Sequence, residues 1–266
     1  MSFEIERSNA GTSVSLLGGH RFDLPVITDG DLNSYPIQIF YNSLPIAGEA
    51  FTKLKAISED RTLSPLGVEQ KSDPVKAELV GRIAAAAGQI RLFDNSTTNM
   101  EIQLFELPSI ESTNTVAAVE DREIRDWWRS LSNKEQTKLL EQVKSDPSQH
   151  ERLMVALLRA PAPLALLDYQ TKFVGEVWKE AKRASNPEKA AQIELDRRHV
   201  ETARRGLAHV AGIAGRVSGW KAETVLRSLI NSPFEPAKHG FDIFGFDTKQ
   251  VAEMRLRIDK EQASGR

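Results

Sequence analysis

The segment from Pro187 to Val217 contains no proline after its first residue, and it constrains the fold more than any other feature of the chain. Proline is tolerated in the first turn of a helix, and Asn186 before it is a suitable N-cap. A continuous helix here would be about 46 Å long at 1.5 Å per residue. Its apolar residues recur at heptad-like steps, namely Ile193, Val200, Ala203, Leu207, Val210, Ala214 and Val217. The segment therefore predicts the long spine helix of a helical bundle.

The length and composition of the chain limit the classes of protein to which it can belong. With 266 residues, 40 % of them hydrophobic and 27 % charged, the chain is expected to form one large or two small globular domains. The formal net charge of −2 gives no overall bias toward nucleic acid or membrane. The lack of cysteine excludes disulfides, iron–sulfur clusters and cysteine nucleophiles. No apolar run is long enough to span a membrane and no secretory signal opens the chain, so we expect no membrane association.

Residues 1–60 differ from the rest because prolines and glycines interrupt short apolar runs. Val14–Leu17 and Ile37–Tyr41 could form strands, and Glu49–Ser58 a short helix. So few strands cannot close a sandwich or a barrel. We expect an irregular, partly β N-terminal arm, either extended or a small β element that needs a partner surface. A two-stranded cap on the bundle is the alternative.

Residues 61–217 are predicted to form the helical bundle. From Pro74 a helical pattern places apolar residues on one face, and the polar run Asp94–Asn99 could end that helix. Residues 100–107 fit either a strand or a continuing helix, because their apolar positions do not decide the period.

Short helices follow between residues 116 and 163. Ser132 and Glu135 have the spacing of a capping box, which predicts a helix start. A further helix over residues 164–184 leads into the spine helix.

Residues 218–266 are predicted to form two short helices, 221–230 and 248–262, around a glycine-punctuated segment with three phenylalanines. Exposed aromatic side chains are unfavourable unless they dock on a surface, which makes this segment the best candidate for a partner contact. Docking on its own bundle is the alternative. The candidate contact residues are Phe241, Phe244 and Phe246.

Several short motifs between residues 61 and 163 resemble a known group of proteins. A Ser-Pro-x-Gly run at residues 64–67 precedes an alanine-rich helix, and Asp146-Pro147 and a Leu-Leu-x-Ala-Pro stretch at residues 157–161 follow. In these motifs the chain is similar to uncharacterised helical proteins encoded among the structural genes of tailed bacteriophages. The resemblance implies a structural or assembly role in a virion, on a protein made in the host cytoplasm. Its expected partners are other structural proteins and copies of itself, and it implies no active site.

Asp196 and His199 are three residues apart in the spine helix and could face one metal from a single turn. A di-metal bundle site would need a second such pair, which the sequence lacks. Asp196 also interrupts the apolar stripe, so a buried carboxylate paired with an arginine is the simpler interpretation. We therefore predict no metal, no cofactor and no catalytic residue.

Two arginine doublets recur seven residues apart on the spine helix, where they could meet DNA phosphates. Neighbouring acidic residues dilute the patch, and a solvated face with salt bridges is favoured over a nucleic-acid site. The doublets are Arg197, Arg198, Arg204 and Arg205. The predicted function is a non-enzymatic structural component of a phage-like virion, in its head, neck or tail. The alternative is an intracellular assembly factor or adaptor that binds protein or DNA through the arginine-rich face.

Overall fold

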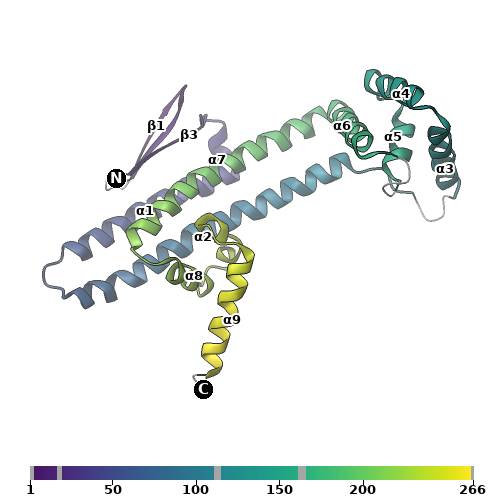
Figure 1. Cartoon of the computed structure of the whole chain (residues 1–266). Coiled ribbons are helices and arrows are strands. Elements are labelled where there is room, and N and C mark those ends of the chain that lie inside the picture. The colour runs from purple at the N-terminus through teal and green to yellow at the C-terminus, as the bar shows by residue number, and fades with distance from the viewer. Residues whose placement is uncertain (1–2, 17–19, 111–114, 161–165, 265–266) are drawn as a thin grey trace. The chain divides into compact units, whose positions relative to one another are not determined.

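The computed structural model describes residues 3–16, 20–110, 115–160 and 166–264, which form mainly helices and a small β-sheet near the N-terminus (Figure 1). This confirms the predicted fold class. Backbone contacts divide the chain into two units. Unit 1 comprises Met1–Thr97 and Leu195–Arg266, and unit 2 comprises Thr98–Glu194. These limits differ from the regions 1–60, 61–217 and 218–266 drawn from the sequence, because unit 1 joins two segments that are distant along the chain.

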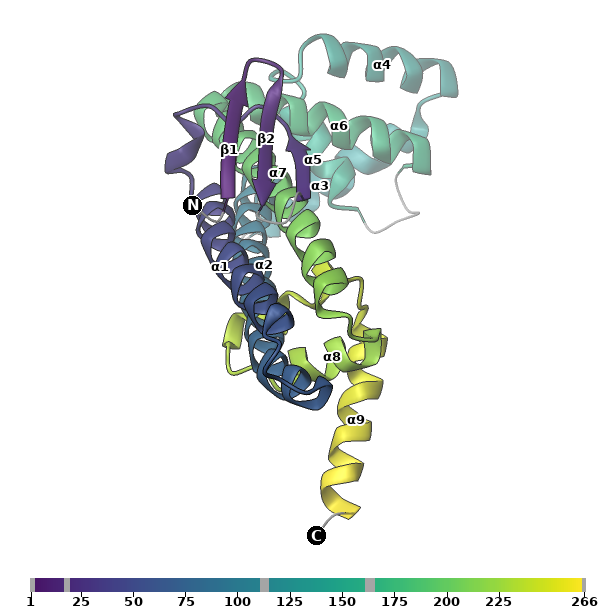
Figure 2. The same ribbon diagram turned by 90° about the vertical axis from the view of Figure 1, so that its left-hand side faces the viewer.

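Three long helices run side by side in unit 1 (Figures 1 and 2). They are α1 (Tyr35–Glu59), the part of α2 (Pro65–Phe105) up to Thr97, and the part of α7 (Pro187–Ser218) from Leu195 onward. The apolar stripe predicted for the spine helix is buried here at Val200, Ala203, Leu207, Val210 and Ala214. Gly206 lets α7 approach α1 closely, since a Cβ there would lie 2.5 Å from Cε2 of Phe40. The predicted spine helix is confirmed to within one residue at its C-terminal end.

A three-stranded antiparallel sheet covers this framework, with β2 between β1 and β3 (Figure 2). The strands are β1 (Phe3–Ser8), β2 (Gly11–Leu16) and β3 (His20–Leu24). Alternate residues of β2 and β3 are buried in the same core as α1, α2 and α7, namely Val14, Leu16, Phe22 and Leu24. The N-terminal strands are thus held by the chain's own helices, which corrects the expectation of an element that needs a partner surface. Leu17, the predicted end of a strand, lies outside the described residues.

The C-terminal segments of unit 1 pack on another face of α2. They are α8 (Ala222–Ile230), the short 3-10 helices η2 (Glu235–His239) and η3 (Phe241–Phe244), and α9 (Thr248–Ser264). Their apolar residues form one cluster with Val80 and Ala84 of α2. The backbones approach so closely that a Cβ at Gly240 would lie 1.9 Å from the carbonyl oxygen of Ala84. The tetra-alanine run of α2 therefore serves close packing, because small side chains leave room for a second backbone.

Unit 2 contains a group of shorter helices, α3 (Thr115–Ser130), α4 (Asn133–Ser145), α5 (Glu151–Leu158) and α6 (Asp168–Ser185). The capping box predicted at the start of α4 is confirmed, because Ser132 and Glu135 exchange side-chain-to-backbone hydrogen bonds. Trp128, Met154, Val174 and Trp178 are among the buried residues of the core. The predicted start of α6 at residue 164 lies outside the described residues.

The strand predicted at Ile37–Tyr41 is wrong, because these residues belong to α1. The buried residues Ile37, Phe40, Leu44 and Ala47 follow a helical period that a five-residue window did not reveal. Pro36, which separated short segments in the sequence, lies in the first turn of the helix, where a proline is favourable.

The predicted start of α2 at Pro74 is wrong, and of the two alternatives left open for residues 100–107 the continuing helix is the one observed. The helix begins at Pro65, contains Pro74, and continues through Asp94–Asn99 to Phe105. The hydroxyl of Thr97, which is 0 % exposed, donates to the carbonyl of Phe93 at 3.3 Å within the same helix. Polar residues with short side chains favour turns, but here the hydroxyl is satisfied by the helix backbone itself, so the helix continues.

Candidate functional site

The arginine-rich face of α7 is divided in the structure, because its arginines contact different segments of unit 1. Arg197 lies 3.6 Å from the Asp94 carboxylate of α2, and Arg204 lies 2.6 Å from Asp242 of η3. Arg198 is directed elsewhere, with Nη2 3.6 Å from Oδ1 of Asp31. Arg205 is exposed, and no carboxylate of the described chain forms an ion pair with it. The seven-residue spacing thus brings three of the four arginines to one side.

A pocket of about 620 Å³ lies at that side, between α2, α7 and η3. Its charged lining is balanced, with three arginines and three acidic side chains. The lining consists of Asp94, Arg197, Val200, Glu201, Arg204, Arg205, Ala208, Asp242 and Ile243. An anion such as a DNA phosphate would meet carboxylates next to two of the three guanidinium groups, those of Arg197 and Arg204, so this surface suits a segment with charges of both signs better than a phosphate backbone.

His199 contacts a residue distant along the chain. Its Nε2 lies 2.7 Å from Oδ1 of Asp31, in the 3-10 helix η1 (Asp31–Asn33) between the sheet and α1. The other carboxylate oxygen of Asp31 accepts hydrogen bonds from the backbone and the hydroxyl of Thr28, both at 2.8 Å. Burial would raise the pKa of Asp31, but the hydrogen bonds from His199 and Thr28 outweigh burial and lower the pKa to about 2.

The pair therefore fastens the segment between the sheet and α1 to the spine helix. His199 is 6 % exposed and its Nδ1 is buried without a hydrogen-bond partner. Asp196, the other member of the metal pair considered from the sequence, is also buried, at 8 % exposure. Within the described ranges, no three His, Cys, Asp or Glu side chains gather in a way that could hold a metal ion.

The three phenylalanines proposed for a partner contact lie at different depths in unit 1. Phe241 is buried at 7 % exposure among residues of α2, α8 and α9, and the guanidinium of Arg255 lies 5.9 Å from its ring centroid. Phe244 and Phe246 are half-buried and pack against the same cluster. Phe241 thus contributes to the interior of the chain, and only Phe244 and Phe246 keep surface that a partner could touch.

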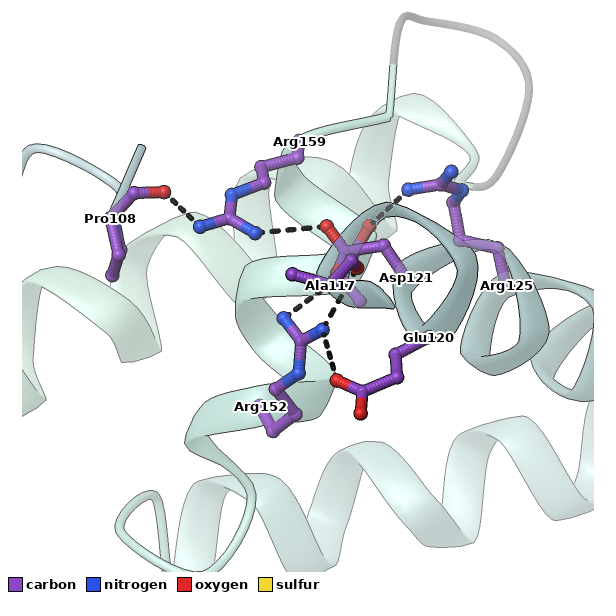
Figure 3. Close-up of polar contacts among 8 residues, drawn as sticks. Pro108, Ala117, Glu120, Asp121, Arg125, Arg152 and Arg159 are labelled. Atoms are coloured by element: carbon purple, nitrogen blue, oxygen red, sulfur yellow. Dashed lines mark hydrogen bonds and ion pairs between the residues drawn. The ribbon is translucent and has the colours of Figure 1, made fainter. Parts of the chain in front are cut away.

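Unit 2 contains a buried carboxylate that sequence reasoning missed (Figure 3). Asp121 of α3 is 1 % exposed, and its Oδ2 accepts a hydrogen bond from Arg159 at 2.9 Å. Its Oδ1 lies 2.5 Å from Arg152, an ionic contact without the direction of a hydrogen bond. Arg159 also donates to the carbonyl of Pro108, and Arg152 to that of Ala117 at 3.1 Å. The cluster therefore joins α3, α5 and the chain at Pro108.

A signal for this carboxylate was present in the sequence. Asp121, Ile124 and Trp128 recur at three- and four-residue steps, so they share the inward face of α3. A charged residue on an apolar face is expected to meet an opposite charge. Nothing local indicates that the partners are arginines of α5.

A different side of α3 exposes large apolar side chains. Val116 is 65 % exposed, Val119 54 % and Trp127 49 %. Their positions fall within one side of the helix, next to the buried face that carries Asp121 and Trp128. We name Val116, Val119 and Trp127 the α3 surface.

Comparison with known proteins found no matching family model, no similar curated protein and no similar solved structure. In the described part of the chain, no helix combines the length and apolar character that crossing a membrane requires.

Proposed function

We propose that the protein is a structural component that acts through contacts with other proteins and performs no catalysis. The observation that supports this proposal is the α3 surface. Exposed apolar side chains that share one face, and do not lie scattered, are typical of protein-protein contact sites.

The energetics of the α3 surface favour association. Full burial of a large apolar side chain contributes about 1.5–3 kcal/mol relative to full exposure. Val116, Val119 and Trp127 are each about half exposed or more, so a partner that covers them would gain on the order of 1 kcal/mol from each. Tryptophan is also enriched among the residues that dominate binding at interfaces.

The buried cluster around Asp121 holds the helix that carries this surface. Asp121 lies on the buried side of α3, where Arg152 and Arg159 join the helix to α5. A rigid helix loses less conformational entropy when a partner binds, which favours affinity.

The place of this contact in a phage-like virion follows from the resemblance of residues 61–163 to proteins of phage structural genes. We therefore propose copies of this chain and other virion structural proteins as the partners, in the head, neck or tail. The chain would be made in the host cytoplasm and then incorporated into the particle.

A double variant tests the proposal, with Val116→Glu and Trp127→Glu in the full chain. Both residues are exposed, and glutamate is a good helix former, so the helix should persist. The matched control is Leu256→Glu in α9, whose side chain is 60 % exposed in unit 1. We expect native mass spectrometry to show fewer assembled species for the double variant. Particles produced with it should contain less of the chain than particles produced with the control. Equal incorporation and equal assembly masses for both variants would contradict the proposal.

The alternative function is an assembly factor or adaptor that binds protein or DNA through the arginine face. Arg205 is the observation that favours it, because this exposed guanidinium has no carboxylate partner in the described chain. Charge reversal with Arg204→Glu and Arg205→Glu should then abolish binding of duplex DNA at low salt. If the natural chain binds no DNA at about 50 mM salt, where phosphate contacts are strong, DNA binding is ruled out.

A further inference from the structure

The outer edge of β1 carries backbone groups that do not pair with β2. Ser8 and Gly11 are partners across a two-residue connection, and such a connection closes on a hydrogen-bonded pair. Hydrogen-bonded and non-hydrogen-bonded pairs alternate along an antiparallel ladder. Glu4 and Glu6 therefore exchange backbone hydrogen bonds with β2, at Ser15 and Ser13. The amide and carbonyl groups of Phe3, Ile5 and Arg7 point away from β2.

These outward groups are not paired by the rest of the described chain. β1 is the first strand in the order β1-β2-β3, so it has a neighbouring strand on one side (Figure 2). No described residue donates a hydrogen bond to the carbonyl oxygen of Ile5 or accepts one from its amide. A row of unpaired donors and acceptors at a sheet edge is a template for another strand.

We propose that the outer edge of β1 binds an extended segment of another protein in which basic residues alternate with apolar ones. The segment adds a fourth strand to the sheet. Its backbone pairs with Phe3, Ile5 and Arg7, and its basic side chains lie beside Glu4 and Glu6. This surface is separate from the α3 surface, so either proposal can fail alone.

Charge decides the chemistry of the segment. The solvent face of β1 carries Glu4 and Glu6, both exposed. Glu6 lies 3.6 Å from Arg21 of β3, a side chain that is itself 62 % exposed, whereas no described cation forms an ion pair with Glu4. Opposite charges across neighbouring strands stabilise the pairing, and like charges destabilise it. An incoming strand with lysine or arginine at these two positions is therefore favoured.

The same charges disfavour a second copy of β1 as the incoming strand. Outward-facing residues must pair with outward-facing residues, so an antiparallel pairing that overlaps most of β1 places Glu4 or Glu6 opposite a glutamate of the second copy. When Ile5 lies opposite Ile5 of the second copy, Glu4 lies opposite Glu6 and Glu6 opposite Glu4, so two pairs of like charges repel. The occupant is thus a different sequence, with basic residues where β1 has acidic ones.

The alternation of side chains along a pleated strand decides where the segment needs apolar residues. Phe3 and Ile5 point to the inner face of the sheet, where both are partly buried against the core of unit 1. Side chains of a fourth strand that face the same way would extend this apolar layer. Valine suits these positions, because β-branched residues pack well on a pleated surface.

The test uses a labelled peptide, acetyl-Thr-Lys-Val-Lys-Val-Lys-Thr-amide, and the full chain. Fluorescence anisotropy measures binding, and amide hydrogen exchange reports the pairing. We expect the amides of Phe3, Ile5 and Arg7 to exchange more slowly with the peptide, while those of Glu4 and Glu6 change little. A peptide with glutamate in place of lysine should bind about tenfold more weakly, from two reversed cross-strand pairs.

Two controls separate strand addition from simple attraction of charges. The lysine peptide N-methylated at its valines lacks the amides that would pair with β1, and it should not bind. The variant Glu4→Lys with Glu6→Lys, whose altered side chains are exposed, should reverse the preference and bind the glutamate peptide. Equal binding of the methylated peptide, uniform protection along β1, or no binding of the lysine peptide would each overturn the proposal.

Discussion

Gly88 of α2 allows the C-terminal segment of unit 1 to dock on its backbone. A Cβ built on Gly88 would lie 1.8 Å from the carbonyl oxygen of Pro236 and 3.4 Å from Cβ of His239. Real Cβ atoms do not approach backbone oxygens so closely, so Gly88→Ala must move η2 away from α2. A backbone oxygen cannot turn aside as a flexible side chain can.

The size of the effect follows from two opposing contributions. Restoring ordinary contact requires a shift of about 1.5 Å between two backbones, and overpacking of a filled core costs about 1–3 kcal/mol. Alanine has the higher helix propensity, so replacing glycine by alanine inside a helix offsets about 1 kcal/mol of the overpacking cost. We expect the upper part of the overpacking range, because the obstacle is backbone, and therefore a net loss of about 2 kcal/mol.

Gly215→Ala in α7 is the matched control. It is also a glycine inside a helix of unit 1, but a Cβ there would meet nothing within 4 Å. This variant should gain up to about 1 kcal/mol from helix propensity alone. The two variants should therefore differ by about 3 kcal/mol, or roughly 6–12 °C in Tm for a unit of this size. Thermal unfolding followed by circular dichroism measures the difference. If Gly88→Ala melts at or above the Tm of Gly215→Ala, the close approach of η2 to α2 is refuted.

Two further predictions concern the buried carboxylates. Asp121→Asn should destabilise unit 2 by about 2 kcal/mol in urea unfolding, because the buried Asp121 loses the charge that pairs with Arg159 and Arg152, whose side chains are 16 % and 42 % exposed. Asp126→Asn, at a side chain 52 % exposed, should cost less than about 0.5 kcal/mol. Equal midpoints for these variants would contradict the role assigned to Asp121. The pKa of Asp31 is lowered from 3.8 to about 2 in the folded protein, so its ionised form stabilises the fold above about pH 4. This contribution is at most about 2 kcal/mol, and it is lost as the pH falls from 4 to 2. In the Asp31→Asn variant the free energy of unfolding should depend less on pH between pH 4 and 2. If that dependence is the same as in the natural chain, the contact with His199 contributes nothing to stability.

Elements with strong local signals could be predicted from the sequence. The spine helix has a favourable N-terminus and an apolar period sustained over many turns, and α7 spans Pro187–Ser218. The capping box of Ser132 and Glu135 fixed the start of α4 for the same reason, since both partners lie within one turn. In such segments local preference and tertiary packing agree.

The errors fall where local preference and packing disagree. Polar residues between Asp94 and Asn99 favour a turn, yet α2 passes through them, with Thr97 bonded to the helix backbone and fully buried. Residues 37–41 are rich in β-branched and aromatic side chains, yet their apolar period over a longer window is helical. At residues 37–41 burial in the core of unit 1 outweighs propensity, which is a weak preference of less than about 1 kcal/mol per residue. Between Asp94 and Asn99 the buried residue is Thr97, whose hydroxyl is satisfied within the helix.

The arginines of α7 show why a site is harder to predict than a helix. The seven-residue spacing predicted one side for all four arginines, and Arg197, Arg204 and Arg205 line one pocket whereas Arg198 contacts Asp31. A helix sequence contains no information on which segments will cover its charged residues. The carboxylates that pair with Arg197, Arg198 and Arg204 come from α2, η1 and η3, and Asp31 is 168 residues from His199 in the chain. The positive potential of such a face is therefore overestimated when only the charges of its own helix are counted. Folding lowers it whenever distant acidic residues pack beside it, and the remaining exposed charge, here Arg205, is what a partner would meet.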